Sequence, residues 1–197
     1  MYLGFIDLKT LYLILHLFGI ALGAGAAFFS DIMFFSAIKD MRFSNTEIRF
    51  LKLGSRTVWI GLCVLVISGV LLFMTDPARY AHSSKFLAKM TIVAIIVVNG
   101  YIFHRIHIPR IMRHAREELP SSEEFKRKSI SMFASGAVSV ASWISAAILG
   151  AFKKIPYDYI EIMMVYMLIL SFAVFVSFFL HGRYFPKLGK NLTDSNM

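Results

Sequence analysis

The chain has 197 residues, of which 57% are apolar, and its formal net charge is +9. Its apolar residues come in runs too long for a soluble core, which excludes an ordinary soluble domain and indicates a membrane protein. The positive charge does not indicate nucleic-acid binding, because the basic residues lie between the apolar runs, as membrane topology requires. The single cysteine, Cys63, excludes an intramolecular disulfide.

Five apolar runs are each long enough to cross a bilayer, and each is expected to be a helix because lipid offers backbone groups no other partner. The predicted fold is therefore an all-α integral membrane protein, a five-transmembrane-helix bundle that forms a single domain over residues 1–197. Its amino terminus lacks the positive region of a signal peptide, so the first run is interpreted as an uncleaved span. The predicted spans are 11–37, 57–75, 86–107, 130–151 and 159–181.

The distribution of basic residues predicts the orientation of the spans. With the amino terminus outside, five lysines and arginines fall in the first cytoplasmic connection, seven in the second and three at the carboxyl end, 15 of the 21 in the chain. The positive-inside rule then favours amino terminus out and carboxyl terminus in. The expected location is a bacterial-type cytoplasmic (inner) membrane.

The segments between the predicted spans contain helix caps and prolines that predict local structure. Ser44 to Glu47 offers helix caps and predicts a short amphipathic helix leading into the second span. Ser121 to Glu124 contains a capping box before the fourth span. Pro109 is expected to limit how far the third span extends, and Pro77 to mark a turn.

The first span carries the two residues that cost most in lipid, His16 and Asp31. At about 100° per residue they share one face with Gly19, Gly23, Ala27 and Ser30, so this small, polar face is predicted to lie inside the bundle. Asp31 lies about 22 Å below His16 at ~1.5 Å per residue, near the inner interface, where Arg56 or another basic residue could pair with it.

His16 is the first candidate site residue. Its imidazole could ligate haem iron or another metal, or relay protons; alternatively it is a neutral histidine bonded to a neighbouring helix. The glycines beside it leave room either for a flat macrocycle or for a close helix contact. Lys89 lies at about the depth of His16 and could snorkel to the headgroups, supply a second axial ligand or pair with a haem propionate. Glu161 is a further candidate partner for Lys89 or Lys85.

His104 and His181 lie at similar depth near the cytoplasmic side, as two axial ligands of one haem would have to. Headgroup contact is the competing interpretation, and it is favoured for His104 and His181 as it is for His107 and His114. Asn99 is deep enough to require a hydrogen bond to another helix. Serines along one face of the fourth span indicate either helix packing or a polar pathway: Ser131, Ser135, Ser139 and Ser142.

A family resemblance rests on three stretches of the sequence. Leu15-His16, the small patch Ala26 to Phe29, and the Lys-rich entry Lys85 to Val93 with the downstream His104 resemble small haem-associated membrane proteins of the HemJ-like and copper-resistance-D-like families. The resemblance covers about a quarter of the chain. It implies that His16 is the haem-ligand histidine and Lys89 the lysine at the head of the third span. The tryptophan and Pro-Arg pair of the HemJ-like first helix are missing, which speaks against protoporphyrinogen oxidation.

The sequence therefore favours a membrane protein that binds haem b between spans one and three, through cofactor residues His16, Lys89, His104 and His181, for electron transfer or a haem-linked redox step. Two other classes stay open. One is a non-catalytic assembly or structural subunit, and the other is a small proton-coupled transporter that uses Asp31, Asn99 and the serine face. The expected partners are the lipid bilayer, a membrane or redox protein, or a second copy of the chain, and no nucleic acid.

Overall fold

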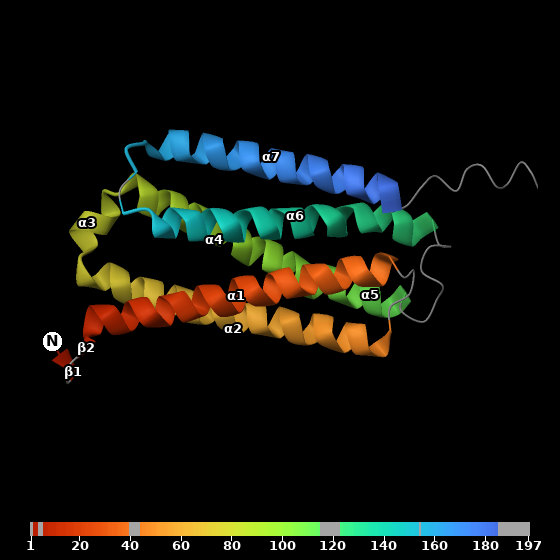
Figure 1. The fold of residues 1–197 in the computed structure, drawn as a ribbon, viewed down its shortest axis with the longest axis horizontal. Helices are drawn as coiled ribbons and strands as arrows, with labels where there is room; N and C mark the ends of the chain where they lie inside the picture. Colours follow the sequence, from red (N-terminus) through yellow and green to blue (C-terminus); the bar gives the residue numbers. More distant parts are fainter. Residues whose placement is uncertain (1, 4–5, 40–43, 115–122, 154, 185–197) are drawn as a thin grey trace, which may run out of the picture.

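Five long helical rods dominate the computed structural model, which describes residues 2–3, 6–39, 44–114, 123–153 and 155–184 (Figure 1). Each rod contains a segment long and apolar enough to cross a membrane, so the five predicted helices are confirmed. The rods are α1 (Leu8–Lys39), α2 (Asn45–Thr75), the continuous run of α4 (Ser84–Ile102), η1 (Phe103–His107) and α5 (Ile108–His114), α6 (Glu123–Ala151) and α7 (Tyr159–Tyr184).

The two ends of the bundle differ in charge. At one end α1, α5 and α7 finish and α2 begins, and this end carries most of the described arginines; we call it the basic end. The other end holds the short helix α3 (Pro77–Ala81), and we call it the α3 end. The α1 helix has 32 residues, about 48 Å at ~1.5 Å per residue, which exceeds the roughly 30 Å of a hydrocarbon core.

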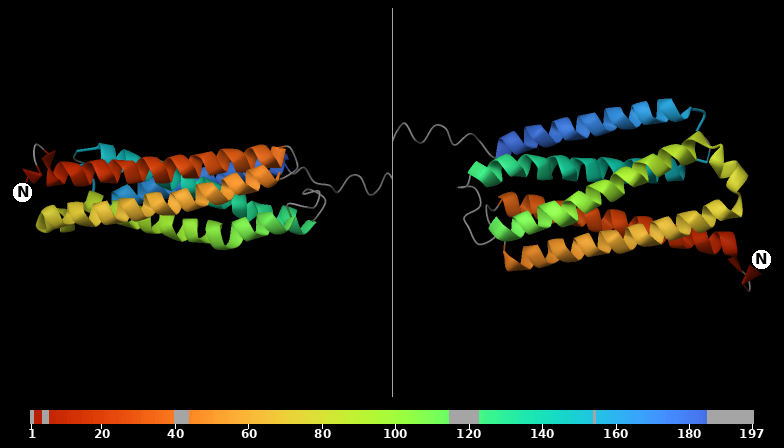
Figure 2. Two further views of the ribbon diagram at one scale, coloured as in Figure 1. Left: turned by 90° about the horizontal axis from the view of Figure 1, so that it is seen from below. Right: turned by 180° about the vertical axis from the view of Figure 1, so that it is seen from behind.

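Helix α6 is the central element of the bundle (Figures 1 and 2). Half of its most apolar segment is buried inside the protein, against 17–22% for the other four rods. The α1 and α2 helices lie side by side, α7 covers one side of α6, and α4 runs obliquely across the bundle. A two-residue antiparallel pair, β1 (Tyr2–Leu3) with β2 (Ile6–Asp7), precedes α1 and was not predicted.

The predicted caps around Ser44 are confirmed, and they start α2 itself rather than a separate helix. Ser44 accepts a hydrogen bond from the Glu47 backbone N–H at 3.1 Å, and the Glu47 carboxylate accepts one from the Ser44 backbone N–H at 2.7 Å. This reciprocal capping box satisfies donors that the first helical turn leaves free. The second predicted capping box, at Ser121 to Glu124, falls partly outside the described residues.

Replacing Ser44 by Ala should therefore lower stability by about 1 kcal/mol, the usual cost of losing an N-cap side chain. Thr46→Ala is the matched control, since Thr46 follows the cap and makes no described hydrogen bond. Thermal unfolding in detergent measures both variants. Equal melting temperatures for the two would show that the box does not hold the start of α2.

Pro109 does not end the third rod, contrary to expectation. The helix widens into the π-helical turn η1 just before it, where the Ile108 N–H donates to the carbonyl of Phe103, five residues earlier. Proline has no N–H to donate, and its ring collides with the carbonyl four residues before it in a regular α-helix. The wider turn accommodates both defects, as π-turns do elsewhere, and the rod continues to His114. Pro77 likewise begins helix α3 rather than a simple turn.

Candidate functional site

The α1 and α2 helices touch backbone to backbone at three glycines. A Cβ added at Gly19 would lie 2.7 Å from the Leu65 nitrogen, and one added at Gly61 would lie 2.6 Å from the Gly23 Cα. The indole ring of Trp143, from α6, packs against Gly23. The small face of α1 is thus used for close helix packing, so the space beside Gly19 and Gly23 is filled by protein.

His16 forms a hydrogen bond to the neighbouring helix. Its Nδ1 lies 3.1 Å from the Ser68 Oγ. The Ser68 hydroxyl lies 2.6 Å from the Val64 carbonyl and 3.1 Å from that of Leu65, and its one hydrogen is used there. We therefore assign Nδ1 of His16 as the donor to Ser68.

Lys89 extends from the first half of α4. The Lys89 ammonium also lies beside Gly150 of α6, 3.8 Å from where a Cβ would stand. Lys85 donates to the carbonyl of Phe152, which follows the end of α6. Glu161 does not pair with either lysine, contrary to expectation, since its carboxylate accepts from the Asp158 backbone N–H at the start of α7.

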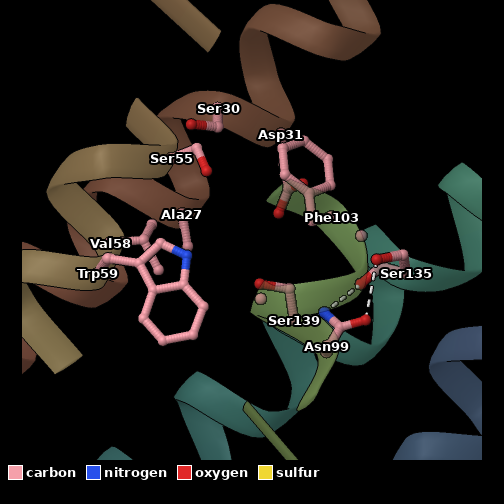
Figure 3. Close-up of a pocket in the computed structure, with 12 residues that line it drawn as sticks. Ala27, Ser30, Asp31, Ser55, Val58, Trp59, Asn99, Phe103, Ser135 and Ser139 are labelled. Atoms are coloured by element: carbon pink, nitrogen blue, oxygen red, sulfur yellow. Dashed lines mark hydrogen bonds between the residues drawn. The ribbon is translucent and has the colours of Figure 1, made fainter. Parts of the chain in front are cut away.

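A small polar cavity lies between α1, α2, α4 and α6 (Figure 3). Its volume is about 40 Å³ measured at the centres of water-sized molecules, room for roughly three waters at ~10–15 Å³ each. Its polar lining is Ser30, Asp31, Ser55, Asn99, Ser135 and Ser139, and its apolar wall includes Ala27, Val58, Trp59 and Phe103.

Asp31 is the charge-bearing residue of this cavity. Its Oδ2 is buried without a hydrogen-bond partner among the described residues, and so is the Oγ of neighbouring Ser30. Gly136 makes room for the carboxyl group, since a Cβ there would lie 3.2 Å from Oδ1. Arg56 is exposed and makes no described hydrogen bond to Asp31. The expected pair between Asp31 and Arg56 is therefore wrong.

Two apolar clusters lie on either side of the cavity along the bundle axis. Toward the α3 end, Trp143, Leu62 and Ile92 belong to a fully packed core. Toward the basic end, Phe34, Leu51 and Phe133 form a second cluster, with ring contacts between Phe34 and Phe133 at 5.8 Å. The cavity therefore lies between two apolar clusters.

Asn99 and the serines of α6 form the predicted interhelical bonds. The Asn99 amide donates to the Ser135 carbonyl at 3.0 Å, and the Ser135 hydroxyl donates to the Asn99 Oδ1 at 2.8 Å. Farther along α6, Ser142 lies 2.8 Å from the Tyr166 hydroxyl of α7. Ser142 therefore serves helix packing, while Ser135 and Ser139 line the cavity wall.

The structure pairs His104 and His181 with serines of different helices rather than with each other. His104 Nδ1 lies 2.8 Å from the Ser55 Oγ of α2. His181 Nε2 lies 2.8 Å from the Ser129 Oγ of α6. Of these residues, Ser55 also lines the cavity of Asp31. That link was not predicted, because nothing in the spacing of the sequence relates residue 55 to residue 104.

His107 departs from its predicted place at the headgroup surface. It is 2% exposed, and both ring nitrogens lack a hydrogen-bond partner among the described residues. The edge of the Phe103 ring lies against it, with centroids 5.9 Å apart. The π-turn rotates this residue inward, which a regular helical projection could not anticipate. The side chain of His114 lies outside the described residues.

Comparison with protein-family models, curated proteins and solved structures gives no match for this chain. Within the described ranges, no group of three or more His, Cys, Asp or Glu side chains is placed to hold a metal ion. The haem-family resemblance accordingly stays a prediction, and the site is argued from its geometry alone.

Proposed function

We propose that the five apolar rods span a membrane with the basic end in the cytoplasm. The surface supports insertion, because α7 exposes an apolar face far larger than soluble proteins show: Ile160, Met164, Leu168, Phe172, Phe175 and Phe179. The excess of lysine and arginine at the basic end supports the orientation.

This orientation predicts the result of reporter fusions. A reporter active only in the periplasm should work when fused after Asp76 or Phe152, which follow the rods at the α3 end. It should fail when fused after Leu119 or Met197. The reverse pattern would place the basic end outside.

We further propose that the protein is a small proton-coupled carrier in which Asp31 is the proton-binding group. The observation that supports this is the Asp31 Oδ2, which is buried without a hydrogen-bond partner among the described residues and lies in a small cavity between four helices. An isolated charge in an apolar setting is very costly, so the carboxyl group must hold either a proton or a cation. Ionisable residues kept at such positions are typical of proton pathways.

The donor set favours a proton over a metal cation. Calcium takes about six to eight oxygen ligands, whereas this cavity offers one carboxyl group. Asn99 and Ser135 are already bonded to each other, and Ser55 to His104. A proton needs only one oxygen of Asp31, so it can occupy a site that offers a single carboxyl group.

Carbodiimide labelling tests this function. A hydrophobic carbodiimide adds to a protonated carboxyl group within a membrane and leaves a stable adduct that peptide mass spectrometry can locate. We expect one adduct on Asp31 at neutral pH and none in Asp31→Asn. Exposed Asp158 and Glu161 serve as internal controls and should stay unmodified. Labelling of those two but not of Asp31 would contradict the proposal.

Haem binding at His16 remains a second candidate, favoured by one observation. A histidine that ligates a metal usually donates its other N–H to a neighbour, as Nδ1 of His16 does to Ser68. The packed glycines fill the side where room for a macrocycle was expected. A haem would therefore have to approach Nε2 from another side, with Lys89 as the nearby cation.

The absorption spectrum of the purified protein decides this candidate. If haem is bound through His16, the protein expressed with added haem precursor shows a Soret band that His16→Ala removes or shifts. His82→Ala, an exposed residue next to α3, is the control and should leave the spectrum alone. A colourless wild type would exclude haem. A band that survives His16→Ala would point to His104 and His181.

A further inference from the structure

We propose that Ser55 and His104 form the proton outlet of the Asp31 cavity toward the basic end. This inference rests on the proton-binding role of Asp31. Ser55 and Asp31 line the same cavity from α2 and α1, with Ser30 near both (Figure 3). Ser55 is 4% exposed, and its hydroxyl lies 2.8 Å from Nδ1 of His104.

A proton relay requires a hydroxyl that can both accept and donate a hydrogen, and the Ser55 hydroxyl meets this requirement. Ser68 and Ser142 each give their hydroxyl hydrogen to a carbonyl four residues earlier, at 2.6 Å. Ser55 makes no such bond in the described structure, and its described partner is His104. A hydroxyl carries one hydrogen and two lone pairs, so Ser55 can accept a proton from the cavity and donate its own to His104.

His104 provides the exit. His104 is the second residue of the π-turn η1. It is half-buried and precedes the exposed Arg105. It therefore reaches from a buried serine to the surface of the bundle. The charged and titratable residues nearest to the pair in sequence are Lys52 and Arg56 on α2 and Arg105 and His107 beside His104, and Asp31 lines the same cavity as Ser55.

The transfer balances at each step. The Asp31 O–H proton passes to cavity water, which has room in the site. That water gives a proton to the Ser55 Oγ while the original Ser55 hydrogen moves to Nδ1 of His104. His104 then releases a proton from Nε2 to water outside, and Asp31 is left as a carboxylate until it binds the next proton.

Hydrogen–deuterium exchange of the Asp31 carboxyl group, followed by infrared spectroscopy after mixing the protein with D₂O, tests this route. Ser55→Ala and His104→Gln should slow exchange at least about tenfold, a modest part of the roughly 10²–10⁴-fold effect of a positioned acid–base group. Glutamine can keep the bond to Ser55 but cannot take up a proton. Ser55→Thr keeps the hydroxyl and should exchange at nearly the wild-type rate.

Ser177→Ala is the matched control, because Ser177 is also buried but bonds to Val174 of its own helix and lies away from the cavity. Exchange at the wild-type rate in both Ser55→Ala and His104→Gln would overturn the outlet. A wild type without any protonated carboxyl signal would instead overturn the proton-binding role of Asp31. The two failures are therefore distinguishable.

Discussion

Gly61→Ala should destabilise the protein by about 1–3 kcal/mol, the range for forcing extra atoms into a packed core. The new Cβ would lie 2.6 Å from the Gly23 Cα and 3.0 Å from the Gly19 carbonyl oxygen. Backbone atoms cannot turn aside as a side chain can, so α1 and α2 must separate. For a chain of this size, a loss of 1 kcal/mol lowers the melting temperature by about 2–4 °C.

Gly25→Ala is the control for this effect, since it lies on the same α1 helix with no atom within 4 Å of its added Cβ. Alanine is favoured over glycine inside a helix by about 0.5–1 kcal/mol. The Gly25 variant should therefore melt at the wild-type temperature or slightly above it. If the Gly61 variant did the same, the two helices would not be in backbone contact in the protein.

Asp31→Asn should abolish carbodiimide labelling without loss of stability, and it should raise the melting temperature or leave it unchanged. A buried carboxyl group without a partner costs free energy, and an amide of the same shape is neutral without binding a proton. Residues kept for function at the expense of stability commonly behave in this way.

Ser135→Ala provides the contrast within the same cavity. It removes the donor to the Asn99 Oδ1 and should cost about 1 kcal/mol, as lost hydrogen bonds typically do. Thermal unfolding of both variants in one detergent compares them directly. A loss of stability in Asp31→Asn as large as that in Ser135→Ala would mean that Asp31 ties helices together.

Hydrophobic length and charge distribution predicted the five helices because both are properties of local sequence. The cap at Ser44 was also predictable from local sequence, although it begins α2 itself rather than a separate short helix. The passage of the helix through Pro109 did not follow, because a π-turn depends on backbone hydrogen bonds that composition does not show. The inward position of His107 was missed for the same reason.

The candidate site was predictable as a set of residues but not as an arrangement. Asp31, Asn99 and the serines of α6 stand out because polar groups are costly in lipid. Which of them share a cavity depends on how α1 and α4 meet α6, and no local pattern encodes that meeting. Ser55 and Ser68 were missed because serine in a membrane helix is common and usually bonds to its own backbone.

The most direct test of the proton-binding role is the infrared spectrum of the protein in a membrane at neutral pH. Wild type should show the C=O stretching band of a protonated carboxyl group, this band should shift in D₂O, and it should be absent from Asp31→Asn. Identical carboxyl regions in the two spectra would contradict the role of Asp31 as a proton carrier.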